Sequence, residues 1–174
     1  MVPKLARVAI LSDSDIPGAD ASGLAPIERA NVAAAQAAGL TPQVIKVRGP
    51  APDLDAAFKT MASEGAQALV ILEVPVTIPL RKRIAELAAT HRIPTMFWGG
   101  ALDAGGVFTY GTSFTDTFAG VPAAIDKILK GAKPADMPFE LITRREFVVN
   151  LTAARAVGLI IPADLLKRAD RVIE

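Results

Sequence analysis

Polar and aromatic side chains stand at the carboxyl ends of several short apolar segments. They are Asp13, Ser14 and Asp15 after residues 8–12, followed further along the chain by Glu73, Pro75, Trp98 and Tyr110. Because the carboxyl ends of parallel strands meet at one edge of a sheet, we expect these residues to gather there. A crevice of this kind holds a small organic molecule when a few polar groups orient it and an aromatic ring covers it.

Each of these residues also has a structural explanation. Asp and Ser after a strand are common turn and cap residues, and Trp98, the only tryptophan in the chain, would equally well cover the edge of the sheet. Asp13 and Asp15 could together bind Mg²⁺, which makes a small magnesium-dependent α/β enzyme the alternative, although Mg²⁺ sites usually add a substrate phosphate and a basic partner. Residue types and spacing leave these readings open.

The sequence motifs of common enzyme classes are missing. The chain has no Gly-rich phosphate loop, no dinucleotide fingerprint after its first strand and no Gly-x-Ser-x-Gly elbow. It has no cysteine and a single histidine, which excludes thiol catalysis, disulfides and a histidine-based metal centre. We therefore expect no catalytic residue, no metal and no cofactor in a protein that is not an enzyme.

Charge and hydropathy exclude other classes of partner. The formal net charge of +1 over 174 residues gives no reason to expect binding to nucleic acid. No apolar run approaches the ~18 residues that a membrane span requires. The first residues lack a long apolar region after their positive charges, so they do not form a signal peptide, and we expect either a cytosolic protein or a chain that begins after a removed segment.

Strands and helices alternate through the first hundred residues. Strands are expected at 8–12, 41–48, 68–72 and 95–98, and helices at 27–38, 54–64 and 79–91. Uninterrupted apolar strands separated by helices are typical of a mostly parallel sheet that is covered on both faces. The sequence therefore predicts an α/β fold, a three-layer sandwich with right-handed crossovers.

The pattern changes after the paired glycines at 105–106. The segments expected there are a strand at 107–110, one helix at 115–130, a loop at 133–138, a strand at 146–151, a short helix at 152–157 and a terminal helix at 162–172. We accordingly divide the chain into a ligand-binding α/β lobe, residues 1–112, and a second part, residues 113–174. This second part contains a return helix, a linker and a strand–helix segment that packs on the lobe or on a partner.

Four stretches of the chain carry a resemblance to a known family. They are residues 82–94, with Arg-Ile-Ala-Glu-Leu-Ala-Ala-Thr-His-Arg-Ile-Pro at their core; residues 104–111, Ala-Gly-Gly-Val-Phe-Thr-Tyr-Gly; residues 125–138, which include Lys-Gly-Ala-Lys-Pro-Ala-Asp-Met-Pro; and residues 147–162, which begin Phe-Val-Val-Asn-Leu. Together they resemble the carboxy-terminal half of the ABC-transporter substrate-binding proteins, a family that includes tryptophan and tyrosine binders. The resemblance implies a type I periplasmic-binding fold, in which two lobes clamp a ligand between them.

The resemblance also implies a site and partners. Family contacts to the ligand come from strand-end loops that correspond to Asp13, Ser14, Glu73, Pro75 and Trp98. This chain has Ser-Asp-Ser-Asp where family members often carry Asn-Pro or Asn-Ser, and Trp-Gly-Gly-Ala where they often carry Arg-Glu-Phe. The acidic residues favour a ligand that bears an amine.

We therefore expect the solute-binding component of an ABC importer, with an aromatic amino acid or a related compound as ligand and an ABC permease as partner. Its location would be periplasmic or otherwise extracytoplasmic. A sensory ligand-binding module of a regulator is a further alternative. Because the helix at 115–130 would return the chain to a lobe that these residues do not include, we also expect a homodimer formed through that helix.

Overall fold

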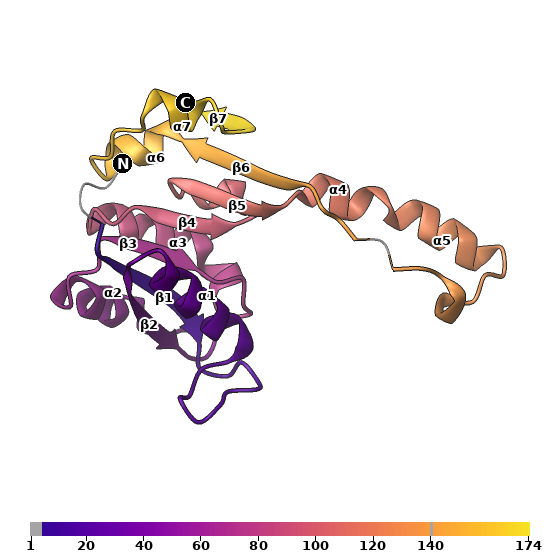
Figure 1. Ribbon diagram of the computed structural model, residues 1–174, viewed down its shortest axis with the longest axis horizontal. Helices are drawn as coiled ribbons and strands as arrows, with labels where there is room; N and C mark the ends of the chain where they lie inside the picture. The colour runs from indigo at the N-terminus through magenta and orange to yellow at the C-terminus, as the bar shows by residue number, and fades with distance from the viewer. Residues whose placement is uncertain (1–4, 140) are drawn as a thin grey trace.

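The computed structural model describes residues 5–139 and 141–174, which form a seven-stranded sheet in the order β2-β1-β3-β4-β5-β6-β7 (Figure 1). The strands are β1 Arg7–Asp13, β2 Thr41–Val47, β3 Ala68–Ile71, β4 Thr95–Trp98, β5 Phe108–Thr112, β6 Arg145–Asn150 and β7 Arg171–Ile173. Strands β1 to β5 are parallel, β6 is antiparallel to β5, and β7 is parallel to β6. The predicted mostly parallel α/β sheet is confirmed.

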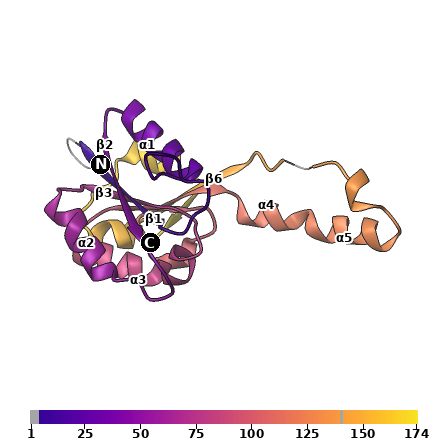
Figure 2. The ribbon, with the colours of Figure 1, turned by 90° about the horizontal axis from the view of Figure 1, so that it is seen from below.

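Helices cover the sheet on both faces. The helices of the body are α1 Pro26–Ala37, α2 Leu54–Ser63, α3 Thr77–Thr90, α6 Leu151–Ala156 and α7 Ala163–Leu166, with a 3-10 turn, η1, at Leu102–Ala104. Figure 2 shows α1 on one side of the sheet and α2 and α3 on the other. The three layers that the sequence predicts are therefore present.

Strand β1 lies at the centre of this packing. It pairs with β2 on one side and β3 on the other, and its residues from Val8 to Asp13 are all buried. On the face toward α2 and α3, Phe58, Met61 and Ile84 are fully buried within one hydrophobic core. A strand covered on both faces has no side in contact with water, which is why residues 8–12 are all apolar or small.

Two helices project from the body instead of covering it. Helices α4 Phe114–Ala119 and α5 Val121–Leu129 leave the end of β5 and extend away from the sheet (Figures 1 and 2). A 3-10 turn, η2 Pro134–Asp136, precedes the return to β6. We call residues 113–139 and 141–144 the arm.

The prediction of a single helix at 115–130 is wrong, because the structure has two helices there. The structure divides it at Gly120, which caps both α4 and α5. Pro122 follows in the first turn of α5, and proline cannot donate the backbone hydrogen bond that would continue α4. The Gly120 backbone keeps helical angles, φ −79° and ψ −18°, so the second helix continues from the first.

The terminal helix expected at 162–172 is also wrong. Helix α7 is a single turn, and Arg171–Ile173 form the edge strand β7. Asp170 sets this register, because its N–H donates to the Phe147 carbonyl at 2.8 Å while its carboxylate accepts the Phe147 N–H, also at 2.8 Å. Backbone hydrogen bonding to the open edge of β6 thus determines the structure of these residues, in spite of the helical spacing of their leucines.

The division at residue 112 stays a prediction. Strand β6 lies in the second part of the chain, yet it pairs along β5, from Phe108 opposite Val149 to Thr112 opposite Arg145. The second part therefore contributes two strands, β6 and β7, to the sheet of the first. The remainder of that part consists of the arm and the helices α6 and α7.

Glycines bring the ends of β4 and β5 into close approach. A Cβ atom on Gly99 would lie 2.6 Å from the Thr112 carbonyl oxygen, and one on Gly111 would lie 2.6 Å from the Gly99 nitrogen. Both distances are to backbone atoms, which cannot rotate away as a side chain can. Only glycine fits at these two positions, so this corner of the sheet depends on them.

We predict that Gly99→Ala lowers the free energy of unfolding by about 2 kcal/mol, within the usual range for overpacking. The reason is the backbone clash, which forces β4 and β5 apart at their carboxyl ends. Denaturant titration followed by circular dichroism measures the change. Gly120→Ala is the control: its backbone is helical, so equal or slightly higher stability is expected there. Equal stability for Gly99→Ala and the wild type would contradict the prediction.

Candidate functional site

The carboxyl edge of the parallel strands contains two neighbouring hollows. The first, about 660 Å³, is lined by Asp13, Asp15, Ile16, Pro17, Gly49, Pro50, Val74, Pro75, Val76 and Pro79, and we call it the Asp13 hollow. The second, about 670 Å³, is lined by Glu73, Trp98, Gly99, Tyr110, Gly111, Thr112, Thr117, Phe118, Ile142 and Arg145, and we call it the Trp98 hollow. The residues after β3 contribute to both.

Asp13 and Asp15 have different environments within the Asp13 hollow. Asp13 is 7% exposed, and its carboxylate accepts the Asp15 N–H at 2.9 Å, a turn of the kind that aspartate forms after a strand. The Asp15 carboxylate lies 3.0 Å from Arg48 Nε in an exposed ion pair. The alternative that these aspartates are turn residues is therefore correct for Asp13. The charge of Asp15 is balanced by Arg48.

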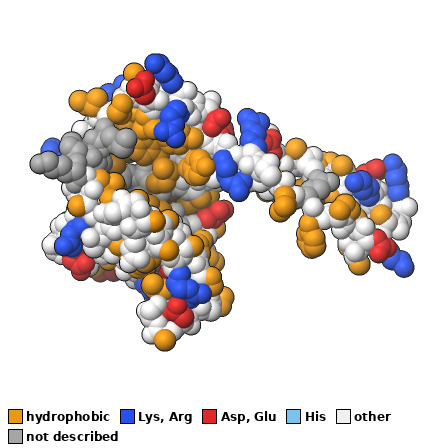
Figure 3. Space-filling model, in the orientation of Figure 1, with side chains coloured by type: hydrophobic (Ala, Val, Ile, Leu, Met, Phe, Trp, Pro, Cys, Tyr) orange, Lys and Arg blue, Asp and Glu red, His pale blue; other side chains and the backbone are white. Residues whose placement is uncertain are grey.

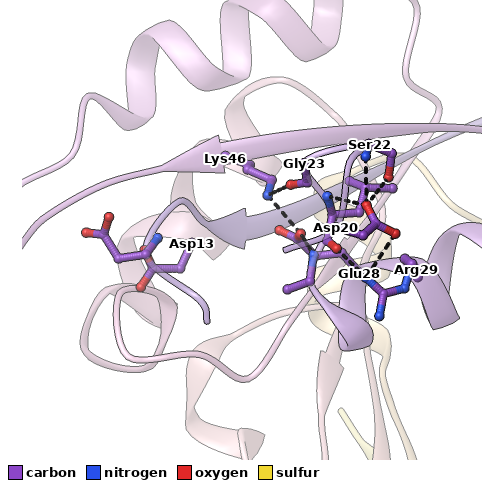
Figure 4. A network of polar contacts seen from close by, with 10 residues as sticks. Asp13, Asp20, Ser22, Gly23, Glu28, Arg29 and Lys46 are labelled. Atoms are coloured by element: carbon purple, nitrogen blue, oxygen red, sulfur yellow. Dashed lines mark hydrogen bonds and ion pairs between the residues drawn. The ribbon is translucent and has the colours of Figure 1, made fainter. Parts of the chain in front are cut away.

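A buried ion pair fixes the wall formed by the loop from β1 to α1 (Figure 4). The Glu28 side chain is fully buried; its carboxylate accepts the Ala25 N–H at 2.7 Å and lies 2.8 Å from Lys46 Nζ on β2. Lys46 also donates to the Gly23 carbonyl at 2.6 Å. Burial alone would raise the pKa of Glu28, but the bonds from Lys46 and the Ala25 N–H outweigh it and lower that pKa below its usual value.

A second cluster holds the outer part of the same loop. Asp20 accepts hydrogen bonds from the backbone N–H and the hydroxyl of Ser22, and its other oxygen lies 3.0 Å from Arg29. The Ser22 hydroxyl is the main cause of a lowered pKa for Asp20, with Arg29 adding to it. In Figure 4, Asp13 lies apart from both clusters with its carboxylate pointing away from them. The two clusters therefore shape the loop and leave Asp13 to the hollow.

Thr77 fixes the loop after β3. Its buried hydroxyl bonds to the Leu72 carbonyl and, at 3.0 Å, to the Val74 carbonyl, and it accepts the Val74 N–H at 3.2 Å. Val74 is buried while Glu73 and Pro75 are exposed. This loop thus presents Glu73 to the Trp98 hollow and Pro75 to the Asp13 hollow.

Aromatic rings and opposite charges meet in the Trp98 hollow. Strand pairing sets Trp98 opposite Tyr110, and Tyr110, 53% exposed, packs edge-on against Phe147 with ring centroids 6.4 Å apart. Glu73 and Arg145 line the same hollow. Arg145 Nη1 donates to the Ile142 carbonyl at 2.9 Å, which steadies the guanidinium.

The structure divides the predicted site residues between the two hollows. Asp13, Asp15 and Pro75 line the first, Glu73, Trp98 and Tyr110 line the second, and Ser14 lines neither. Ser14 instead donates its backbone N–H to the Val47 carbonyl at 2.9 Å. The expected gathering at one edge is present, as two hollows and not one.

Sequence analysis missed Arg145, Phe118 and Glu28. Arg145 begins β6, and because β6 is antiparallel to β5 its amino end lies at the carboxyl edge of the other strands. Phe118 comes from the first helix of the arm. The sequence signal for Glu28 was its position three residues after the helix cap at Ala25, where a glutamate often completes a capping box.

The described ranges 5–139 and 141–174 contain no group of three or more His, Cys, Asp or Glu side chains that could hold a metal ion. The Asp13 and Asp15 pair therefore has no third acidic neighbour, and Asp15 is already paired with Arg48. Among the described helices, none is long and apolar enough to cross a membrane.

The structure is an open α/β sheet with hollows at its carboxyl edge, the edge at which sheets of this kind bind ligands. A solved structure titled the ABC domain in complex with L-Trp, from Streptococcus pneumonia, superposes with a TM-score of 0.80 at 23% identity, covering 98% of this chain and 56% of that one. A conserved domain protein from Vibrio cholerae gives a TM-score of 0.77 at 17% identity, with 98% and 56% covered. These likenesses establish the fold.

A third solved structure is similar in the same way. It is the ligand-free, open structure of a substrate binding protein with adhesive properties from Clostridium difficile, with a TM-score of 0.68 at 14% identity, covering 99% of this chain and 56% of that one. This chain thus spans just over half the length of the solved structures that it matches. A comparison with curated proteins finds no match.

The family model described as ABC transporter substrate binding protein matches residues 1–173, and the chain belongs to that family. The predicted resemblance is therefore confirmed. This is a family of substrate-binding proteins and not an enzyme class, as the sequence predicts.

We predict that Glu28→Gln lowers the free energy of unfolding at pH 7 by about 2 kcal/mol, the size expected for a hydrogen-bonded charge. The folded-state pKa of Glu28 is depressed, so the ionised carboxylate stabilises the fold above its unfolded-state pKa. That contribution is lost as the pH falls through the lower, folded-state pKa.

Denaturant titrations of wild type and Glu28→Gln across the acidic range measure this effect. The difference between the two proteins is expected to be full at neutral pH and to shrink in acid. Asp20→Asn, at an exposed carboxylate of the same loop, is the control and should change stability much less. A difference for Glu28→Gln that does not vary with pH would contradict the assignment.

Proposed function

We propose that this chain binds an aromatic amino acid, or a related compound with an amine and a ring, as part of the substrate-binding protein of an ABC importer. The observation that carries the proposal is the composition of the Trp98 hollow. Three aromatic residues, a glutamate and an arginine line a single concave surface of about 670 Å³. An α-amino acid with an aromatic side chain carries the complementary groups.

Each group of such a ligand has a counterpart in the hollow. The Glu73 carboxylate is suited to the ammonium group, and the Arg145 guanidinium to the carboxylate, which it can bind with two parallel N–H donors. Arg145 has five N–H donors, more than its bonds to the Ile142 and Thr143 carbonyls use. Trp98 and Tyr110 offer faces for stacking the ligand ring.

The Asp13 hollow extends this binding surface. Val74, Val76 and several prolines make it mostly apolar, and Asp13 is its least exposed charged residue. We propose that Asp13, Ser14, Asp15 and Pro75 belong to the wider binding surface, as the family resemblance implies. Their part is to hold the region of the ligand that extends past Glu73.

The hollows form one wall of a cleft. In a two-lobe binding protein the ligand lies between the lobes, which close around it by rotation about a hinge. This chain matches just over half of its structural neighbours' length. The L-Trp in one of those neighbours supports an aromatic amino acid as the ligand class. We propose that the partner is an ABC permease and that the location is extracytoplasmic.

Trp98 permits a direct test, because it is the only tryptophan in the chain. We predict that its fluorescence emission, excited selectively, changes saturably with phenylalanine and related aromatic amines. Binding of tryptophan itself is expected to be detected by calorimetry. Aliphatic amino acids, aromatic acids without an amine, polyamines and Mg²⁺ complete the panel and should bind at least tenfold more weakly. A folded wild-type chain that responds saturably to none of the aromatic amines would contradict the proposal.

Variants assign the roles within the hollow. Glu73→Gln and Arg145→Gln are each expected to weaken binding by about tenfold to a hundredfold, the loss of one charge-assisted hydrogen bond. Glu86→Gln is the matched control, since Glu86 is an exposed carboxylate on α3 that pairs with Arg83 outside the hollow. Equal affinity for Glu73→Gln and Glu86→Gln would remove Glu73 from the site.

A further inference from the structure

The first two turns of α3 contact both of the loops that carry Glu73 and Trp98 into the Trp98 hollow. The hydroxyl of Thr77, the first residue of α3, bonds to the backbone carbonyls on either side of Glu73. Arg81, four residues later, bonds to Asp103 in η1, which follows Trp98 along the chain. Residues four apart are neighbours on one side of a helix, so the same side of α3 holds both loops.

Arg81 and Asp103 are joined by two parallel hydrogen bonds. Arg81 Nε donates to one Asp103 carboxylate oxygen and Nη2 donates to the other, both at 2.8 Å. Arg81 Nη1 donates to the Ile78 carbonyl at 2.9 Å, which fixes the guanidinium on its own helix. The bonds from Arg81 are the main cause of a lowered pKa for Asp103. This carboxylate therefore stays ionised, and paired with Arg81, at neutral pH.

Exposed ion pairs are common on this surface, but most serve no loop. Figure 3 shows acidic and basic side chains beside one another on both the body and the arm. Arg83, on the same helix as Arg81, approaches Asp55 and Glu86 at 3.5 Å through single contacts. Such pairs add little to stability, whereas a bidentate pair of arginine and carboxylate also fixes a direction. The pair of Arg81 and Asp103 is therefore suited to hold a loop in one position.

The segment between Trp98 and Asp103 is short and packed against the core. The Ala101 N–H donates to the Trp98 carbonyl at 3.3 Å, and the Ala104 N–H donates to the Ala101 carbonyl at 3.1 Å. Ala101 and Ala104 are both buried in the hydrophobic core. Two consecutive turns thus connect Asp103 to Trp98 and Gly99, which line the hollow.

We propose that Arg81 is a positioning residue of the ligand site, which sets Trp98 at a fixed place relative to Glu73 through its paired bonds to Asp103. Arg81 lines neither hollow, so it acts through the loop and not by touching a ligand. The effect on binding rests on the proposed function, because a ligand with a ring and an amine needs both of its contacts at a matched distance. The position of the loop does not depend on the identity of the ligand.

Trp98 reports on this loop in the absence of ligand, because it is the only tryptophan in the chain. Arg81→Gln and Asp103→Asn are each expected to raise the quenching of Trp98 emission by acrylamide and to shift the emission maximum, while far-ultraviolet circular dichroism shows an unchanged fold. The double variant should equal either single variant, since both remove one shared interaction.

Arg83→Gln is the matched control for this measurement. It removes exposed ion pairs from the same helix and should leave the emission and quenching of Trp98 as in the wild type. Emission and quenching of Arg81→Gln that equal those of the wild type would overturn the proposal. A double variant whose change is the sum of the two single changes would also do so, because the two residues would then act separately.

Affinity for phenylalanine, measured by calorimetry, separates this proposal from the proposed function. Arg81→Gln and Asp103→Asn should each weaken binding about fivefold, the size of effect that one exposed ion pair can have, and Arg83→Gln should bind as the wild type does. A wild type that binds and an Arg81→Gln variant that binds equally well would overturn the positioning role. A wild type that binds no aromatic amine would contradict the proposed function instead, and the quenching of Trp98 then decides alone whether Arg81 holds the loop.

Discussion

The burial of β1 between β2 and β3 is the constraint on which the rest of this structure depends. Its residues from Val8 to Asp13 are covered on both faces, and parallel pairing on both sides fixes the direction of the neighbouring strands. Since these strands run the same way, their carboxyl ends and the loops that follow lie at one edge of the sheet. Every residue proposed to contact a ligand is at or beside that edge, so the binding surface follows from the direction of the strands.

The edge is then shaped by polar groups that line neither hollow. Glu28 and Lys46 hold the loop after β1, and Thr77 holds the loop after β3. A buried ion pair contributes little net stability when its desolvation is counted, but removing one partner is costly. In this protein the pair fixes a loop geometry, which agrees with the general use of buried polar groups to specify one conformation. Gly99 and Gly111 have a related role, because their close approach sets the floor of the Trp98 hollow.

The body and the arm follow opposite rules. The body buries its apolar residues within one core, whereas the arm presents Val121, Ile125 and Ile128 to the outside. The chain spans just over half the length of its structural neighbours, and we propose that its two hollows form one wall of a cleft.

The sequence by itself determined the order of the α/β elements, the parallel sheet and the edge where polar residues gather, because these depend on local apolar runs and on breakers. It also determined the family, through motifs spread between residues 82 and 162. The tertiary structure decided the division into two hollows, the contribution of Arg145 from an antiparallel strand, and the edge strand β7 in place of a helix. These features depend on pairing between residues far apart in the chain, where hydrogen bonds to an open strand edge outweigh local helical spacing.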